Sequence, residues 1–367
     1  MRIGFISNLR APYRTLQLAE WSTIKGISIT AYYTDLPKEN RKWKIEKKET
    51  FKEKDITTNN NKFRIGTLFN IVKENDLLIL GGYEKKEYII LSLISKFMNK
   101  KTILLFDGIS VPRITEKENF LKKYLKKNVV SNSRFIFGNG KVSEQYFNKQ
   151  FNYPVDRIEN QYLTVDINKI QKLSLQKETL REEYRKKYKI SRDEKVLIYS
   201  GRLIDIKNIQ SVILALAKSD NEKITLFILG GGVLETEIKT LSNKVGVKTI
   251  ITGFIEDQIE LFRQYSVGDA FILPSLKEPW GLVVNEAMAF GLPVIVSNVC
   301  GCSLDLVKEN YNGYLINPYD INDISKKINK IFEKDHIISF GENSKVMIKE
   351  WSFRNSKLNL EKLLNDL

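Results

Sequence analysis

The chain has 367 residues, which is too long for one ordinary hydrophobic core and suits two domains of comparable size. Hydrophobic residues make up 42% of it and aromatic residues 11%, a composition that excludes a disordered chain. The formal net charge of +15 favours an anionic partner, which is nucleic acid, an anionic membrane face or a phosphorylated substrate.

Short apolar runs alternate with longer helical patterns in the first part of the chain. This rhythm is typical of a parallel sheet that helices cover on both faces. Each run ends in glycine or a small polar residue, where the carboxyl end of a strand opens into a binding crevice. The predicted strands are RIGFIS at 2–7, ISITAYY at 27–33, DLLILGG at 76–82, TILLFDG at 102–108 and RFIFGNG at 134–140, with a helix at 13–25.

Two basic segments, 38–54 and 117–128, belong to this first part. In the second of them, four apolar residues at helical spacing stand beside four lysines: Phe120, Leu121, Tyr124 and Leu125 beside Lys122, Lys123, Lys126 and Lys127. Such a helix lies on a membrane surface or, more simply, turns its apolar stripe to the core and its lysines to solvent. No aromatic-interleaved RNA-binding motif accompanies the lysines, so nucleic acid is not expected as a partner.

A second series of strands follows a polar, charged stretch and also alternates with helices. We therefore expect a second Rossmann-like domain. After about 345 the chain returns to a helical pattern that can pack back on the first domain. The predicted strands are KVLIYSGR at 195–202, ITLFILGGG at 224–232, TIITGF at 249–254, AFILPS at 270–275 and LPVIVS at 292–297.

The stretch KEPWGLVVNEAMAFGLPVIVS, 277–297, carries the clearest signal for chemistry. A proline ahead of the helix and Gly291 just past its end predict a helix from Trp280 to Phe290. Its free N–H groups and dipole would point out of the strand ends and attract an anion. Gly281 would let a phosphate approach the backbone closely.

Two carboxylates, Glu278 and Glu286, stand eight residues apart around this helix start. At ~1.5 Å per residue they are separated by up to about 12 Å, which suits one group at each end of a pyrophosphate. Glu286 would accept hydrogen bonds from ribose hydroxyls, and Glu278 would face a sugar. The alternative for each is an ordinary surface glutamate.

Fixed cations are expected at the first strand end of this domain, where GRLIDIKN contains Arg202 and Lys207. Cations near a departing nucleoside diphosphate stabilise its growing charge in the transition state. Solvated side chains are the alternative for both residues. The glycines 230–232, with Gly231 at their centre, indicate close approach of a ligand or of backbone, and a tight turn explains them equally well.

Neither a metal nor another cofactor is expected. The chain has no Asp-x-Asp, the usual carboxylate arrangement for a divalent ion in a sugar-nucleotide site, and no GxGxxG follows its first strand. Cys300 and Cys302 are predicted to be reduced thiols, and the single histidine, His336, is predicted to be solvated.

Taken together, GRL…KN, LGGG, TGFI, ILPS..EPWGLVVNEAMAFGLPVIVS and NGYL resemble the donor domain of the retaining GT-B glycosyltransferases of family 4. The resemblance covers about 195–320, and its most specific part is the pair of glutamates eight residues apart. It implies that Glu278 contacts the donor sugar and that Glu286 binds the ribose. It further implies that Arg202 and Lys207 bind the diphosphate.

The same resemblance gives roles to the backbone and to the base. It implies that Gly281 and Leu282 donate backbone hydrogen bonds to phosphate, and that Phe254 or Ile255 lies against the base of a UDP- or GDP-sugar. The first domain matches only in pattern, because SNLRAPYR at 7–14 replaces a glycine-rich loop and Asp107 stands near the place of a histidine. Asp107 is our candidate for an acceptor or sugar contact. Arg14 either meets an anionic acceptor or is solvated.

We therefore expect an α/β protein of the GT-B class, with two Rossmann-like domains that face each other across a cleft. The predicted divisions are an acceptor-binding domain at 1–168, a donor-binding domain at 169–345 and a C-terminal helix at 346–367. No apolar run reaches the roughly 18 residues of a spanning helix, and MRIGFISNLR passes directly into a strand, so we expect a cytoplasmic protein, with peripheral binding to an anionic membrane as an option.

The predicted activity is retaining, metal-independent transfer of a sugar to a glycan or lipid-diphosphate-linked acceptor, as in capsule or O-antigen synthesis. Two other classes stay open. One is a GT-B sugar-nucleotide 2-epimerase, whose carboxylate and histidine groups a chain with only His336 can hardly supply. The other is a non-catalytic protein that binds a nucleotide sugar or a membrane.

Overall fold

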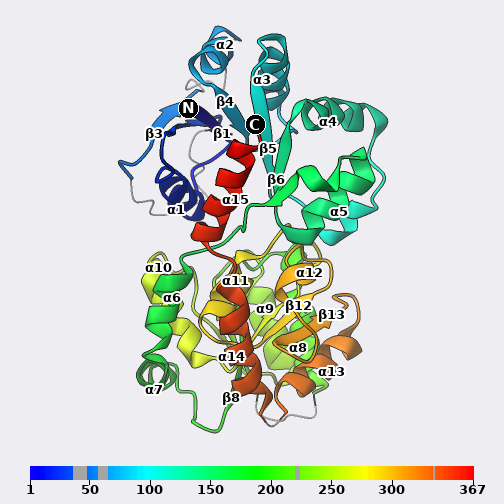
Figure 1. Cartoon of the computed structure of the whole chain (residues 1–367). Coiled ribbons are helices and arrows are strands. Elements are labelled where there is room, and N and C mark those ends of the chain that lie inside the picture. Colours follow the sequence, from blue (N-terminus) through cyan, green and yellow to red (C-terminus); the bar gives the residue numbers. More distant parts are fainter. Residues whose placement is uncertain (36–47, 57–64, 220–223, 334) are drawn as a thin grey trace. The chain divides into compact units, whose positions relative to one another are not determined.

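The computed structural model describes residues 1–35, 48–56, 65–219, 224–333 and 335–367. It separates into two compact units (Figure 1). The first comprises Met1–Leu163 together with Phe353–Leu367, and the second comprises Thr164–Ser352. The sequence analysis places the divisions at 168 and 345 instead.

The first unit is built on a parallel sheet with the strand order β3-β2-β1-β4-β5-β6-β7. Every apolar run predicted as a strand in this part is one, whereas β3 and β7 were not predicted. The strands are β1 Arg2–Ser7, β2 Ser28–Tyr33, β3 Lys52–Asp55, β4 Leu77–Leu80, β5 Lys101–Phe106, β6 Phe135–Gly138 and β7 Ile158–Asn160. The helices are α1 Pro12–Trp21, α2 Ile65–Glu74, α3 Lys86–Phe97, α4 Phe120–Asn132, α5 Gly140–Phe151 and α15 Phe353–Asn365.

One face of this sheet packs against α1 and α15, two helices from opposite ends of the chain. Alternate residues of the strands, such as Ile3 and Phe5, form the core there with Trp21 of α1 and Leu360 of α15. The hydroxyl of Ser356 accepts hydrogen bonds from the amide of Gln17 (2.7 Å) and the indole of Trp21 (3.1 Å). The last helix is therefore part of the first unit.

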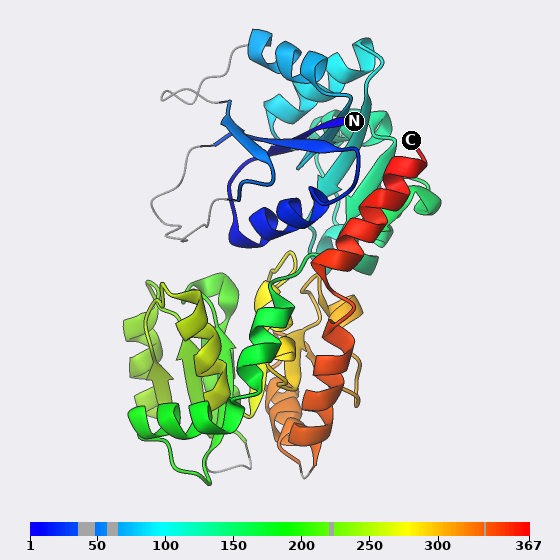
Figure 2. The ribbon, with the colours of Figure 1, turned by 60° about the vertical axis from the view of Figure 1, so that its left-hand side comes forward.

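Helices α2, α3 and α4 follow one another along the other face of the sheet (Figure 2). For α4 the simpler sequence interpretation is wrong. Its apolar residues Phe120, Leu121, Tyr124 and Leu125 are exposed, and Lys126, one of the four lysines that were expected in solvent, is buried. The inward face of this helix is completed by Val129 and Val130.

The other basic segment, 38–54, is only partly described, because 36–47 lie outside the described residues. Its end forms the edge strand β3, whose Glu53 accepts a hydrogen bond from the hydroxyl of Tyr33 (2.9 Å). Alternating charged residues give β3 no apolar run, which is why periodicity did not predict it.

The second unit contains a parallel sheet with the order β10-β9-β8-β11-β12-β13. Its strands include every run predicted in this half. They are β8 Lys195–Ser200, β9 Ile224–Leu229, β10 Thr249–Ile251, β11 Ala270–Leu273, β12 Val294–Ser297 and β13 Gly313–Ile316. The helices are α6 Ile167–Ser174, α7 Lys177–Lys187, α8 Ile209–Ala217, α9 Glu235–Val245, α10 Gln258–Gln264, α11 Leu282–Ala289, α12 Ser303–Leu306, α13 Ile321–Ile331 and α14 His336–Ile348.

Asp269 anchors the start of the central strand β11. Its carboxylate accepts hydrogen bonds from the guanidinium groups of Arg181 and Arg185 on α7, the latter at 3.0 Å, and from the backbone N–H of Val196 at 2.8 Å. Burial lowers the pKa of Arg185, and the charge of Asp269 opposes this shift. The carboxylate thus joins α7 to two neighbouring strands.

His336 was predicted to be solvated, and the structure leaves it only partly exposed. Its ring stacks on Phe340 one turn along α14, with 4.5 Å between the ring centroids, and its Nδ1 lies 2.8 Å from the carbonyl oxygen of Lys330.

No helix in the described part of the chain is long and apolar enough to cross a bilayer.

Replacing Asp269 by alanine should lower the free energy of unfolding by about 3 kcal/mol, because two largely buried guanidinium groups and one backbone N–H lose their acceptor. Urea unfolding of the two proteins measures the difference. The matched control is Glu182→Ala, which breaks the exposed pair with Arg192 and should cost about 0.5 kcal/mol or less. Equal losses in the two variants would contradict the anchoring role.

Candidate functional site

Five neighbouring strands of the second unit, β10, β9, β8, β11 and β12, end at one edge of the sheet. Because all of them are parallel, the loops that follow their carboxyl ends gather there. The predicted residues of the second unit lie in these loops or in the helix that follows one of them: Arg202 and Lys207 after β8, Gly231 after β9, Phe254 and Ile255 after β10, and Glu278, Gly281, Leu282 and Glu286 after β11.

Backbone and amide contacts fasten the loops after β8, β11 and β12 to one another. The N–H of Leu276 donates to the carbonyl of Ile206 (2.9 Å), and the amide of Asn208 donates to the carbonyl of Pro274 (3.3 Å). On the other side, the N–H of Gly301 donates to the carbonyl of Glu278 (3.0 Å). The three loops therefore form one fixed framework.

Helix α11 begins at Leu282, directly after Gly281. Gly281 has φ +100°, a backbone conformation that suits glycine, and no side chain caps the helix start. A Cβ at this position would lie 2.7 Å from Cδ2 of Leu273, so glycine is also required by the close packing. The first N–H groups of the helix and its dipole are left to attract an anion.

Trp280, the residue before Gly281, holds the start of α11 in place. Its indole donates a hydrogen bond to the side chain of Asn285 (3.1 Å) and packs on Trp351, with 4.7 Å between ring centroids. The carbonyl of Trp351 in turn accepts a hydrogen bond from the hydroxyl of Thr164 (2.6 Å). The helix start is thus braced by both ends of the second unit.

Lys207 and Glu278 are brought together as an ion pair between Nζ and Oε2, and both side chains are largely buried. Arg202 is exposed at the start of the same loop, and its carbonyl accepts a hydrogen bond from the hydroxyl of Tyr199 (3.0 Å). Burial raises the pKa of Tyr199, the charge of Glu278 raises it further, and that of Arg202 lowers it. Both charges therefore act on one hydroxyl.

Glu286 is buried on α11 and is not a surface glutamate. Its Oε2 accepts a hydrogen bond from the hydroxyl of Tyr265 at 2.8 Å. Burial raises the pKa of Glu286 to about 7, and the hydrogen bond from Tyr265 only partly opposes this shift. Further hydrogen-bond donors, such as the hydroxyls of a ligand, would stabilise a carboxyl group that is buried in this way.

Tyr265 was not predicted from the sequence as a partner of Glu286. Tyr265 precedes β11 in a short 3₁₀ turn, Tyr265–Val267, and stands far from Glu286 in sequence. No motif in the chain links the two residues. Burial raises the pKa of Tyr265, and so does the neighbouring Glu286, which keeps its hydroxyl a donor.

The triple glycine is explained mainly by close approach of backbone. A Cβ on Gly230 would lie 2.1 Å from the carbonyl oxygen of Gly201, and one on Gly232 would lie 2.4 Å from that of Leu203. Gly231 faces the loop after β10, where a Cβ would lie 3.6 Å from the N atom of Phe254. Phe254 is exposed and Ile255 is partly exposed.

In the first unit the structure brings two predicted residues together. The guanidinium of Arg14 pairs with Asp107 (Nη2–Oδ2, 2.9 Å) and donates to the side chains of Gln17 and Gln161, the latter at 2.8 Å. The prediction of a solvated Arg14 is wrong, because this side chain lies on α1 and is buried. Arg14 and Asp107 line a pocket of about 50 Å³ together with Ser7.

Cys300 and Cys302 are free thiols, as predicted. Both are buried, and burial raises the pKa of both thiols. Within the described residues, no three His, Cys, Asp or Glu side chains are grouped as a metal site requires.

Residues 180–350 match the family model described as glycosyl transferases group 1. The second unit belongs to this family. A similar protein, the uncharacterised glycosyltransferase MJ1607 of Methanocaldococcus jannaschii, is 31% identical over 151 residues, which are 40% of this chain and 38% of that protein. The capsular polysaccharide biosynthesis glycosyltransferase CapM of Staphylococcus aureus is 26% identical over 174 residues, which are 46% and 43% of the two chains. The chain therefore spans less than half the length of either relative.

The fold is shared over the whole length with a solved structure, Alr3699/HepE of Anabaena in complex with UDP. The TM-score is 0.79 at 16% sequence identity, and the match covers 100% of both chains. The predicted fold class, two Rossmann-like domains of the GT-B type, is confirmed. The same Anabaena protein has also been solved with UDP-glucose.

Exchange of Glu286 for glutamine should change how stability depends on pH. The pKa of Glu286 is raised in the folded state from 4.5 to about 7, so the folded state holds a proton that the unfolded chain releases. The stability of the unaltered protein should thus fall, relative to Glu286→Gln, as the pH rises from 4.5 to about 7, by about 3 kcal/mol in total, and level off above. The glutamine side chain in the variant would still accept the hydrogen bond from Tyr265.

Urea unfolding at several pH values between 4.5 and 8 measures this difference. The control is Glu182→Gln, at an exposed carboxylate, whose stability curve should run parallel to that of the unaltered protein. Parallel curves for Glu286→Gln as well would show that Glu286 ionises normally and would contradict the assignment.

Proposed function

We propose that the chain is a retaining glycosyltransferase that moves a sugar from a nucleoside-diphosphate sugar to a hydroxyl of a glycan or lipid-linked acceptor. The observation that carries the proposal is the group formed by the start of α11, the Lys207–Glu278 pair and the buried Glu286 in one framework of loops. The group offers N–H donors and a cation to a diphosphate, with a carboxylate on either side. The similarity to the glycosyltransferase CapM supports sugar transfer, and the UDP-glucose complex of the Anabaena protein supports a nucleotide-sugar donor.

In this proposal the diphosphate binds at the N–H groups of Leu282 and its neighbour, beside Lys207. Gly281 lets the phosphate oxygens reach the backbone. Glu286 accepts hydrogen bonds from the ribose hydroxyls, which supply the partners that its burial calls for. The base lies against Phe254 and Ile255, next to Gly231.

The sugar lies on the side of Glu278, and the acceptor side is assigned to Asp107 of the first unit. The acceptor oxygen forms a bond to the anomeric carbon as the bond from that carbon to the β-phosphate oxygen breaks. The acceptor proton passes to the leaving phosphate on the same face of the sugar, so configuration is retained. Lys207, Arg202 and the dipole of α11 stabilise the charge that develops on the diphosphate.

The biological setting is proposed as assembly of a cell-surface polysaccharide of capsule or O-antigen type, at the cytoplasmic face of a membrane. Its support is the similarity to CapM, which acts in capsular polysaccharide biosynthesis. A panel of UDP- and GDP-sugars, with released diphosphate measured with and without an acceptor, tests the activity. Turnover of the sugar nucleotide without any acceptor would favour an epimerase, and no release with any donor would favour a binding protein.

Lys207→Ala should lower kcat/KM by about 100-fold or more, because a cation beside the leaving diphosphate is lost. Lys327→Ala is a matched control. Lys327 is as buried as Lys207, and it pairs with Glu309 (2.9 Å) near β13, at the edge of the sheet and away from the proposed site. The control should keep the rate within about twofold. Full activity of Lys207→Ala would contradict the donor-site assignment.

Transfer is further proposed to need no metal ion, since Lys207, Arg202 and the start of α11 supply the charge that a divalent ion supplies elsewhere. Treatment with EDTA followed by gel filtration should leave the transfer rate within about twofold of the untreated rate. A loss of activity that Mg²⁺ or Mn²⁺ restores would contradict this part of the proposal.

A further inference from the structure

Helix α4 carries its apolar side chains outward and a lysine inward over its first two turns. Phe120 is 84% exposed, Leu121 64% and Tyr124 56%, whereas Lys126 is 9% exposed. Such large apolar side chains in one place leave a surface that water solvates poorly. We define the α4 patch as the exposed residues of these turns: Phe120, Leu121, Tyr124, Leu125, Lys122 and Lys127.

The order of residues around the helix gives the α4 patch a definite pattern. At 3.6 residues per turn, Phe120, Tyr124, Leu121 and Leu125 follow one another over an arc of roughly 140°. Lys127 borders this arc on one side and Lys122 on the other. An apolar arc with a cation on either side is the pattern of a helix that lies in a lipid interface.

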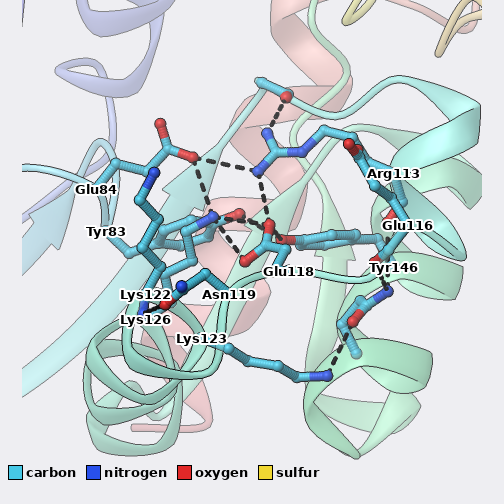
Figure 3. Close-up of polar contacts among 12 residues, drawn as sticks. Tyr83, Glu84, Arg113, Glu116, Glu118, Asn119, Lys122, Lys123, Lys126 and Tyr146 are labelled. Carbon is cyan, nitrogen blue, oxygen red and sulfur yellow. Dashed lines mark hydrogen bonds and ion pairs between the residues drawn. The ribbon is translucent and has the colours of Figure 1, made fainter.

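A polar network beneath α4 holds the patch outward (Figure 3). The ammonium group of Lys126 donates to both carboxylate oxygens of Glu118 (2.8 and 2.9 Å) and lies 3.3 Å from Oε1 of Glu84. Arg113 donates to the same carboxylate of Glu118 (3.3 Å). Turning α4 to bury Phe120 would expose Lys126 and leave Glu118 without its first partner, so the patch is a fixed surface.

The same network connects the α4 patch to the predicted acceptor side. Strand β5 ends at Phe106, Asp107 follows it, and the chain then runs through Gly108 and Arg113 to the start of α4. Nη1 of Arg113 donates to the carbonyl of Gly108 at 2.7 Å. The exposed apolar turns of α4 thus lie on the strand-end side of the first unit, where Arg14 and Asp107 line their pocket.

Charge selects the partner of the α4 patch. Between 117 and 128 the one carboxylate, Glu118, is engaged beneath the helix by Lys126 and Arg113, while Lys117, Lys122 and Lys127 are exposed. The surface therefore offers cations and apolar groups without an exposed carboxylate in this segment. Lipid phosphates and acyl chains complement both features, and the chain's net charge of +15 adds attraction to an anionic bilayer.

We propose that the α4 patch docks the protein on the surface of an anionic lipid bilayer. Phe120, Leu121, Tyr124 and Leu125 enter the boundary between headgroups and acyl chains, and Lys122 and Lys127 meet lipid phosphates. Docking itself does not depend on the proposed function. Its purpose, to present a lipid-linked acceptor beside Asp107, does rest on it.

Flotation with vesicles tests the docking. The protein should bind vesicles of equimolar phosphatidylcholine and phosphatidylglycerol at low salt, and bind pure phosphatidylcholine more weakly. Phe120→Ser with Leu121→Ser should weaken partition by about tenfold or more, since two large apolar side chains lose their burial in lipid. The matched control is Ile338→Ser with Val346→Ser on α14, at exposed apolar positions of the second unit, which should bind like the unaltered protein.

A second pair of variants tests the charge. Lys122→Glu with Lys127→Glu should weaken binding to the anionic vesicles by about tenfold or more and leave the weak binding to phosphatidylcholine unchanged. Lys244→Glu with Lys326→Glu makes the same change in net charge at exposed positions elsewhere and should have a much smaller effect. An unchanged circular dichroism spectrum and an unchanged midpoint of urea unfolding show that each variant is folded.

Three results would overturn the proposal: no binding of the unaltered protein to anionic vesicles, equal losses in the patch and control variants, or a dimer in solution that the Phe120/Leu121 variant dissociates. The last result would assign the patch to a second copy of the chain. Vesicle binding that depends on the patch, without sugar transfer in the donor panel, would leave docking intact and refute the proposed function. Sugar transfer without vesicle binding would refute docking and leave the proposed function intact.

Discussion

Both sheets of the protein are parallel, and this constraint governs where its chemistry can stand. Helices must cover both faces of a parallel sheet, so the inner strands are apolar nearly throughout and offer little polar surface along their length. Polar side chains are left to the loops at the strand ends. In the second unit the carboxyl ends of five neighbouring strands meet at one edge, and residues far apart in sequence, such as Lys207 and Glu278, become partners there.

Much of this arrangement could be predicted from the sequence, because it depends on local signals. The apolar runs of the buried strands are visible as runs, and the glycines that begin and follow α11 mark the helix start where an anion is expected. The edge strand β3 was missed, since its four residues are all charged and carry no apolar signal. Short, exposed strands are formed by their neighbours rather than by their own composition.

The partners of buried side chains, and the face of α4 that is buried, could not be predicted from the sequence. Nothing in the residues around Glu286 indicates Tyr265, and nothing in the first loop indicates that Arg14 turns inward to Asp107 and two glutamines. For α4, periodicity correctly groups four apolar side chains on one face, but it does not tell which face the protein buries. That choice is made by the carboxylates of Glu118 and Glu84, which attract Lys126 from outside the helix.

The inverted orientation of α4 also separates two kinds of evolutionary constraint on a single helix. Lys126, Val129 and Val130 hold the helix in place, so substitutions there are felt by the folded protein itself. Phe120 and Leu121 touch little of the protein, and selection on stability alone would let them drift toward polar residues. Conservation of apolar residues at these two positions among relatives would therefore indicate a partner outside the chain.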